Sequence, residues 1–331
     1  MKRFITDMNE HQFELFCRAL SEHAADHVIV YQHGKLLARH DWVPEARQNQ
    51  YSLSKSFTGT AAGFALAEGL FEMDTRISEL LPDYMPENPC EELKELSVRH
   101  LLTMTAGQQR PLLMGDSRKT LKETDWTSYV LSVPFSDHPG RVFMYSNTGP
   151  YLISRIIEEK TGGSLTDYLM PRLFEPLDIP RPEWEEDPEG HIFGAGGMVL
   201  SSSEVMRFGQ LYLQQGVWNG KQILPEGWVR KVERTAIPTN RGDGEYSLLF
   251  WKSRNDTYSA VGKFGQYCTI CPEKDAVIVI NALDKAISIK RYMSRCANSC
   301  LWPALTARST TACCADMLAA TCMPRPEPLP A

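Results

Sequence analysis

Hydrophobic residues form short runs near the two ends of the chain. The apolar runs 27–31 and 36–39 flank a polar stretch that contains Gly34, so the pattern predicts two strands joined by a turn. Runs with strand character return later, at 246–251, 257–261, 267–271 and 276–281. Their shortness and close spacing are typical of antiparallel strands.

Helical periodicity dominates the middle of the chain, where proline and glycine interrupt it often. A helix is predicted from Ser52 to about Gly69, because glycine just after the last apolar residue commonly ends a helix. Pro171 is expected to kink or end a helix that begins near residue 164. The predicted helices after the first are 97–104, 125–133, 147–160, 164–174 and 203–215.

Strands at both ends of the chain therefore enclose a long helical stretch. This order predicts an α+β fold, with an antiparallel sheet flanked by helices and a mostly helical second domain inserted into it. Residues 1–71 and 186–303 are assigned to the sheet domain and residues 72–185 to the helical domain. Residues 304–331, rich in cysteine and proline, are expected to be a poorly ordered tail. A cleft between the domains is the expected ligand site.

Composition and charge argue against two classes of partner, nucleic acids and membranes. The 331 residues are 43% hydrophobic, enough to bury a large core, and the net charge of −6 is spread without a basic stripe. We therefore expect no nucleic-acid partner and no membrane association. Basic residues at the N-terminus are not followed by an apolar stretch, so no signal peptide is predicted and a cytoplasmic location is expected. The oligomeric state is left open.

Nine cysteines, an odd number, favour reduced thiols over a disulfide framework. Five of them lie in the last 36 residues, at positions 296, 300, 313, 314 and 322. Their spacing matches no zinc-ligand pattern, so we expect neither a metal nor another cofactor.

The most informative chemical pattern is Ser52-Leu53-Ser54-Lys55 at the start of the first predicted helix. Residues three apart share one helix face, so Lys55 can accept the proton of the Ser52 hydroxyl if its pKa is lowered. The alternative is a helix-capping serine followed by a solvated lysine. A Ser-x-x-Lys match is expected roughly once by chance in a chain of this length.

Two further segments carry compatible chemistry. In Tyr145-Ser146-Asn147, a phenol can relay protons and an amide can bind a substrate carbonyl. Otherwise this segment is an ordinary helix start. In the second segment, 262–267, the glycines permit close backbone approach and a strand N–H can complete an oxyanion hole, while Lys263 can meet an anionic group. The alternative is a hairpin turn with an exposed lysine.

Taken together, the order and spacing of these segments resemble the class C β-lactamase-like serine hydrolases, which include penicillin-binding proteins, D-aminopeptidase-type peptidases and related esterases. The resemblance spans about residues 25–285. The matching segments are 51–59, 98–107, 143–147, 194–198 and 265–267. A Gly-x-Ser-x-Gly elbow is absent from the sequence, which argues against an α/β-hydrolase.

The resemblance implies a β-lactamase/transpeptidase-like fold with the site between its two domains. It implies that Ser52 forms an acyl-enzyme, with Lys55 and Tyr145 exchanging protons in an order that the sequence does not assign. It also implies that Asn147 binds the acyl side chain amide. The main-chain N–H groups of Ser52 and Gln266 would form the oxyanion hole.

One departure concerns the third motif, which reads Lys263-Phe264-Gly265 where true lactamases have Lys-Thr-Gly. Phe264 lacks the hydroxyl that would help hold a substrate carboxylate, so hydrolysis of a small ester or amide is favoured over β-lactamase or D-amino-acid peptidase activity. Two alternatives remain: a catalytically silent member that binds a ligand, and a protein that is acylated by antibiotics without releasing them.

Overall fold

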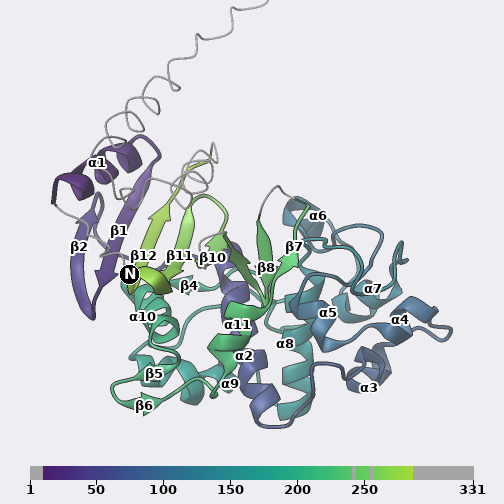
Figure 1. Ribbon diagram of the computed structural model, residues 1–331. Coiled ribbons are helices and arrows are strands. Elements are labelled where there is room, and N and C mark those ends of the chain that lie inside the picture. Colours follow the sequence, from purple (N-terminus) through teal and green to yellow (C-terminus); the bar gives the residue numbers. More distant parts are fainter. Residues whose placement is uncertain (1–9, 241–243, 254–256, 286–331) are drawn as a thin grey trace, which may run out of the picture.

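The sheet joins the two ends of the described chain. The computed structural model describes residues 10–240, 244–253 and 257–285 (Figure 1). Its main sheet has eight strands in the order β2-β1-β12-β11-β10-β9-β8-β7, and the strand pairs are antiparallel. The strands are β1 Ala25–Gln32, β2 Lys35–Asp41, β7 Ile237–Pro238, β8 Glu245–Ser247, β9 Phe250–Lys252, β10 Tyr258–Gly262, β11 Gln266–Cys271 and β12 Ala276–Ala282. Two small sheets pair β3 (Gln48–Asn49) with β4 (Val199–Leu200) and β5 (Val217–Trp218) with β6 (Lys221–Gln222).

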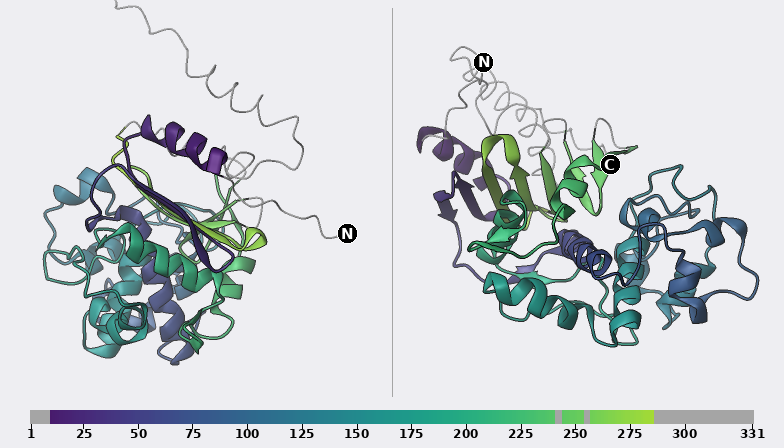
Figure 2. Two further views of the ribbon diagram at one scale, coloured as in Figure 1. Left: turned by 90° about the vertical axis from the view of Figure 1, so that its left-hand side faces the viewer. Right: turned by 60° about the horizontal axis from the view of Figure 1, so that its bottom comes forward.

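Both faces of the central strands are buried, which explains their continuous apolar runs. On β1, Val28 and Val30 face a cluster that includes Phe16 and Leu20 of α1, whereas Ile29 faces the main core on the other side. Strand β12 alternates in the same way. Figure 2 shows α1 lying across one face of the sheet, while α10 covers the opposite face.

Most of the short helices lie on one side of the sheet, beyond α2. Helices α3 to α7 lie together beside the sheet, and α2 runs between them and the strands (Figure 1). The helices are α1 Glu10–Ser21, α2 Ser54–Ala67, α3 Ile77–Leu80, α4 Glu91–Glu95, α5 Val98–Leu102, α6 Gly115–Lys119, α7 Trp126–Ser132, α8 Thr148–Thr161, α9 Leu165–Leu169, α10 Ser202–Leu213 and α11 Trp228–Arg234. Further helical turns, of the 3-10 or π type, are η1 Tyr51–Leu53, η2 Pro82–Tyr84, η3 Met170–Phe174, η4 Glu175–Leu177 and η5 Pro272–Lys274.

The predicted α+β class and antiparallel sheet are confirmed, with two corrections of detail. The run 246–251 is a hairpin of β8 and β9 instead of one strand, because Leu248 and Leu249 have φ of 37° and 70°. The helix predicted over 164–174 ends at Leu169 and continues as the π-helical turn η3, which contains Pro171. Helices α1 and α11 were not predicted, and neither were the short helices α3, α4 and α6 within the predicted helical stretch.

The proposed domain boundaries remain a prediction. One continuous cluster of buried hydrophobic residues includes members of both predicted domains, such as Phe57 on α2, Tyr151 on α8 and Phe250 on β9. The predicted tail 304–331 lies outside the described residues.

Candidate active site

Ser52 lies in the helical turn η1, immediately before α2. The sequence predicted that the helix begins at Ser52, whereas α2 begins at Ser54. The turn is held from both sides: the main-chain N–H of Gln50 donates to the Met198 carbonyl at 2.8 Å, and the Ser54 hydroxyl donates to the Tyr51 carbonyl at 2.6 Å. Leu53 and Ser54 keep right-handed helical angles, so Ser52 and Lys55 still share a face.

Lys55 is buried beside Ser52, with its side chain only 1% exposed. Its Nζ lies 2.9 Å from the Ser52 Oγ and donates to the main-chain carbonyl of Ala195 at 2.5 Å. Burial lowers the pKa of Lys55 well below that of an ordinary lysine, and the nearby positive charge of Arg118 lowers it further. A neutral amine in this place can accept the Ser52 proton while it keeps its hydrogen bond to Ala195.

Tyr145 completes the group around the lysine. Its ring centroid lies 5.1 Å from the Lys55 Nζ. The ring is held by aromatic neighbours, with centroids 5.3 Å from Trp251 and 6.1 Å from Tyr246. The structure therefore brings together Ser52, Lys55 and Tyr145, although about 90 residues separate the last two along the chain.

Asn147 precedes α8 and is 6% exposed. Its Nδ2 donates to the Leu113 carbonyl at 2.6 Å, whereas its buried Oδ1 has no hydrogen-bond partner in the part of the chain that the structure describes. Leaving a buried acceptor unpaired costs about 1–3 kcal/mol, so this oxygen is a favourable acceptor for an N–H group of a ligand.

The segment with the third motif forms the turn between β10 and β11, as the hairpin alternative supposed. Lys263 is exposed, with its Nζ 4.6 Å from the centroid of the Phe264 ring. That ring meets the Tyr51 ring edge-on at 5.1 Å, which places the turn next to the residue before Ser52. Phe264 and Gly265 have φ of 68° and 101°.

The side chain of Gln266 is committed to the sheet. Its Oε1 accepts from the Asn281 Nδ2 at 2.8 Å, and its Nε2 donates to the Ala282 carbonyl at 2.6 Å. The predicted role of the main-chain N–H of Gln266 in an oxyanion hole stays a prediction.

Gly262 shows the close backbone approach that the sequence predicted for the glycines of 262–267. A Cβ on Gly262 would lie 2.2 Å from the Gln50 carbonyl oxygen, so only glycine lets β10 approach the turn η1 this closely. One group near the site was not singled out from the sequence. Arg118, on α6, gave no sequence signal at all, because only folding brings its charge near Lys55.

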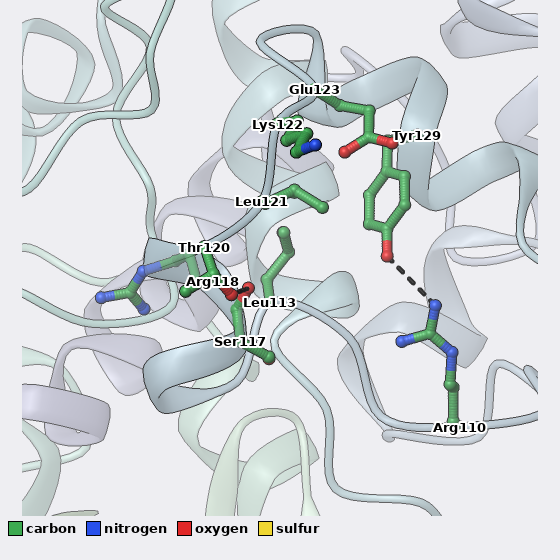
Figure 3. A pocket seen from close by; sticks show the side chains of 9 residues that line it. All are labelled: Arg110, Leu113, Ser117, Arg118, Thr120, Leu121, Lys122, Glu123 and Tyr129. Carbon is green, nitrogen blue, oxygen red and sulfur yellow. Dashed lines mark hydrogen bonds between the residues drawn. The ribbon is translucent and has the colours of Figure 1, made fainter.

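Figure 3 shows a basic cavity, which has a volume of about 300 Å³. Its lining residues are Arg110, Leu113, Ser117, Arg118, Thr120, Leu121, Lys122, Glu123 and Tyr129. Leu113 links this cavity to Asn147, because its carbonyl accepts a hydrogen bond from the Asn147 amide. Arg110 points to the Tyr129 hydroxyl at 3.2 Å, whereas the guanidinium of Arg118 points away from Arg110 and Lys122.

The described residues contain no group of three potential metal ligands. None of the described helices is both long and apolar enough to cross a membrane.

Comparison with known proteins identifies the family of this chain. The family model described as Beta-lactamase matches residues 17–285. A 6-aminohexanoate-dimer hydrolase from Paenarthrobacter ureafaciens is 26% identical over 290 residues, which cover 78% of this chain and 73% of that protein.

Solved structures show the same fold. A putative 6-aminohexanoate-dimer hydrolase from Bacillus anthracis has a TM-score of 0.73 at 18% identity, covering 84% of this chain and 79% of its own. An octameric penicillin-binding protein homologue from Pyrococcus abyssi has a TM-score of 0.71 at 18% identity, covering 88% and 76% respectively. The chain therefore belongs to the β-lactamase family, within the superfamily of β-lactamase-like and penicillin-binding-protein-like hydrolases.

Proposed function

We propose that this protein is a serine hydrolase that cleaves a small ester or amide through an acyl-enzyme on Ser52. The Ser52 Oγ bonds to the substrate carbonyl carbon while its proton passes to the neutral Lys55 amine. The bond from that carbon to the leaving alcohol or amine then breaks, and the leaving group takes a proton from the Lys55–Tyr145 pair. Water, deprotonated by the same pair, releases the acid and restores Ser52.

The contact between Lys55 and Ser52 carries this proposal. A charged lysine 2.9 Å from a hydroxyl would be an ordinary hydrogen-bond donor, but full burial disfavours the ammonium form and leaves a base beside the nucleophile. The aromatic ring of Tyr145 covers this amine on another side. A capping serine followed by a solvated lysine would not show such burial.

The unpaired Asn147 Oδ1 supports a substrate with an N–H group near the scissile carbonyl. The relative from Paenarthrobacter ureafaciens is named for an amide dimer, so small linear amides belong among the substrates to be tried. The exposed Lys263 at the β10–β11 turn could meet an anionic group on such a molecule.

The β-lactamase or D-amino-acid peptidase alternative is less favoured because of Phe264. Its ring is directed to Tyr51 beside the nucleophile, where a lactamase-type motif would offer a hydroxyl to the substrate carboxylate. We expect slow or no turnover of β-lactams, even if they acylate Ser52.

Labelling with a fluorophosphonate probe and with a fluorescent penicillin, beside Ser52→Ala, tests the nucleophile. Labelling that Ser52→Ala abolishes is the expected result, and absence of Ser52-dependent labelling by either probe would refute the assignment. Turnover of p-nitrophenyl butyrate, a 6-aminohexanoate dimer, D-alanine p-nitroanilide and nitrocefin then separates the activities. A protein labelled by neither probe that still binds such molecules would be the silent member instead.

A further inference from the structure

The chain 194–197 forms a turn whose carbonyl groups are all held. Two of the donors come from α2: the Thr58 hydroxyl bonds the Gly194 carbonyl at 2.7 Å, and the Lys55 Nζ bonds that of Ala195 at 2.5 Å. The other two come from the preceding loop: the Trp184 Nε1 bonds the Gly196 carbonyl at 3.0 Å, and the Glu185 N–H bonds that of Gly197 at 3.3 Å. The Ala195 carbonyl is therefore presented to Lys55 by a fully bonded turn.

Glu185 spans this turn from one end to the other. Its N–H bonds the Gly197 carbonyl, and its own carbonyl accepts from the Phe193 N–H at 2.8 Å. The fit against Gly197 is close, since a Cβ there would lie 2.2 Å from the Glu185 Cβ and 2.6 Å from its Oε2. Gly197 also has φ of 83°, a conformation that favours glycine.

Arg118, on α6, contacts the residues on both sides of this turn. Its guanidinium donates to the Glu185 Oε1 at 2.7 Å, and its Cζ lies 4.3 Å from the centroid of the Phe193 ring. The side chain is only 15% exposed. Figure 3 shows its guanidinium turned away from Arg110 and Lys122, the other cations of the cavity. Arg118 thus contacts both flanks of the turn that holds Lys55.

We propose that Arg118 and Glu185 are a positioning pair for Lys55, which holds the turn 194–197 so that the Ala195 carbonyl orients the lysine amine toward Ser52. This inference rests on the proposed function of Ser52 and Lys55. Neither residue is required to touch the substrate. Their contribution is geometric, because a misplaced catalytic group costs up to about 100-fold in rate.

The charge of Arg118 has a second effect on the same amine. Arg118 disfavours the ammonium form of Lys55, so its removal raises the pKa of Lys55 and leaves less of the free base at a given pH. In the part of the chain that the structure describes, the Tyr145 ring lies against the Lys55 amine and the charge of Arg118 acts on it. A change in the Lys55 pKa moves the pH at which the rate falls on the acidic side of its pH profile, here called the acidic limb. Loss of positioning instead lowers the plateau rate at higher pH.

Three variants test the pair: Arg118→Ala, Arg118→Lys and Glu185→Gln. The measurement is the rate of fluorophosphonate labelling of Ser52 as a function of pH, with the melting temperature as a check on folding. Arg118→Ala should lower the plateau rate about tenfold or more and move the acidic limb to higher pH. Glu185→Gln, nearly the same shape, should lower the plateau without moving that limb upward. Arg118→Lys keeps the charge and should recover the position of the limb and part of the plateau.

Arg172→Ala is a matched control. Arg172 also pairs with a glutamate, Glu68, at 2.7 Å and also stacks on an aromatic ring, that of Tyr168, at 3.9 Å. Glu68 follows the far end of α2, about 20 Å along the helix from Lys55. This variant should label at the wild-type rate across the pH range.

Wild-type plateau rates in folded Arg118→Ala and Glu185→Gln would overturn the inference, as would an equal loss in Arg172→Ala. If Arg118→Ala does not fold, Glu185→Gln decides alone. Failure of the proposed function is a different result: in that case even the wild-type protein shows no labelling that depends on Ser52.

Discussion

The amine nitrogen of Lys55 lies 2.9 Å from the hydroxyl oxygen of Ser52, although the lysine side chain is almost completely removed from solvent. Burial would be costly for an ammonium group and is tolerable for a neutral amine. Burial of Lys55 therefore lowers the stability of the fold wherever the amine is charged, and it supplies a neutral amine beside Ser52.

Loss of either proton-handling group should slow turnover while the protein remains folded. We expect Lys55→Ala and Tyr145→Phe each to lower kcat by about 100-fold or more, the usual scale for general acid–base groups. Steady-state hydrolysis of p-nitrophenyl butyrate measures this effect. Lys94→Ala, which removes an exposed lysine that pairs with Glu91, should leave the rate unchanged. Near-normal rates in Lys55→Ala would contradict the role of the base.

The pH dependence of stability should carry the signature of Lys55. Burial lowers its pKa in the folded chain, so between that value and the ordinary lysine value the unfolded chain binds the extra proton. The free energy of unfolding of wild type should then rise relative to Lys55→Met by about 1.4 kcal/mol per pH unit in this window. Urea unfolding between pH 7 and about 9.5 measures the difference. A difference that does not grow with pH would mean that Lys55 is charged in the folded protein.

Asn147→Ala should change substrate preference. The unpaired Oδ1 is offered to a ligand N–H, and deletion of the side chain removes that acceptor. We expect kcat/KM to fall about tenfold for substrates with an acyl-side amide, the equivalent of about 1.4 kcal/mol, and to change much less for simple esters. Paired kinetics on p-nitrophenyl butyrate and on an N-acylglycine p-nitrophenyl ester measure the ratio. An equal fall for both substrates would assign Asn147 a structural role instead.

Gly262→Ala should disturb the nucleophile without touching it. The added Cβ would collide with the main-chain carbonyl of Gln50 at 2.2 Å, so either β10 or the turn η1 must move. Overpacking of this kind costs about 1–3 kcal/mol, and we expect a lower melting temperature together with slower labelling of Ser52. Gly163→Ala is the control, because its Cβ would meet nothing closer than the Asp167 Cβ at 3.7 Å. Labelling of Gly262→Ala at the wild-type rate would show that β10 and the turn η1 can separate without moving Ser52.

Local pattern was sufficient for much of the fold and for part of the site. Apolar runs located the central strands because β1 and β12 are buried on both faces, and the serine-to-lysine spacing placed two side chains on one face because a helical turn repeats every 3.6 residues. Positive φ at Leu248 and Leu249, which turns one apparent strand into a hairpin, left no trace in the hydrophobic pattern, since leucine rarely adopts that conformation.

Tertiary structure alone decided the electrostatics around Ser52 and Lys55. The sequence by itself shows that Ser52 and Lys55 are neighbours, and it allows a solvated lysine as readily as a buried one. The pKa of an amine depends on how far it is removed from solvent and on the charges that the fold brings near it. Here the turn that contains Ala195 lies against the Lys55 amine, and the nearby charge is that of Arg118. Ala195 and Arg118 are 140 and 63 positions along the chain from Lys55. Helical periodicity relates residues a few positions apart, whereas contacts at such separations exist only once the chain has folded.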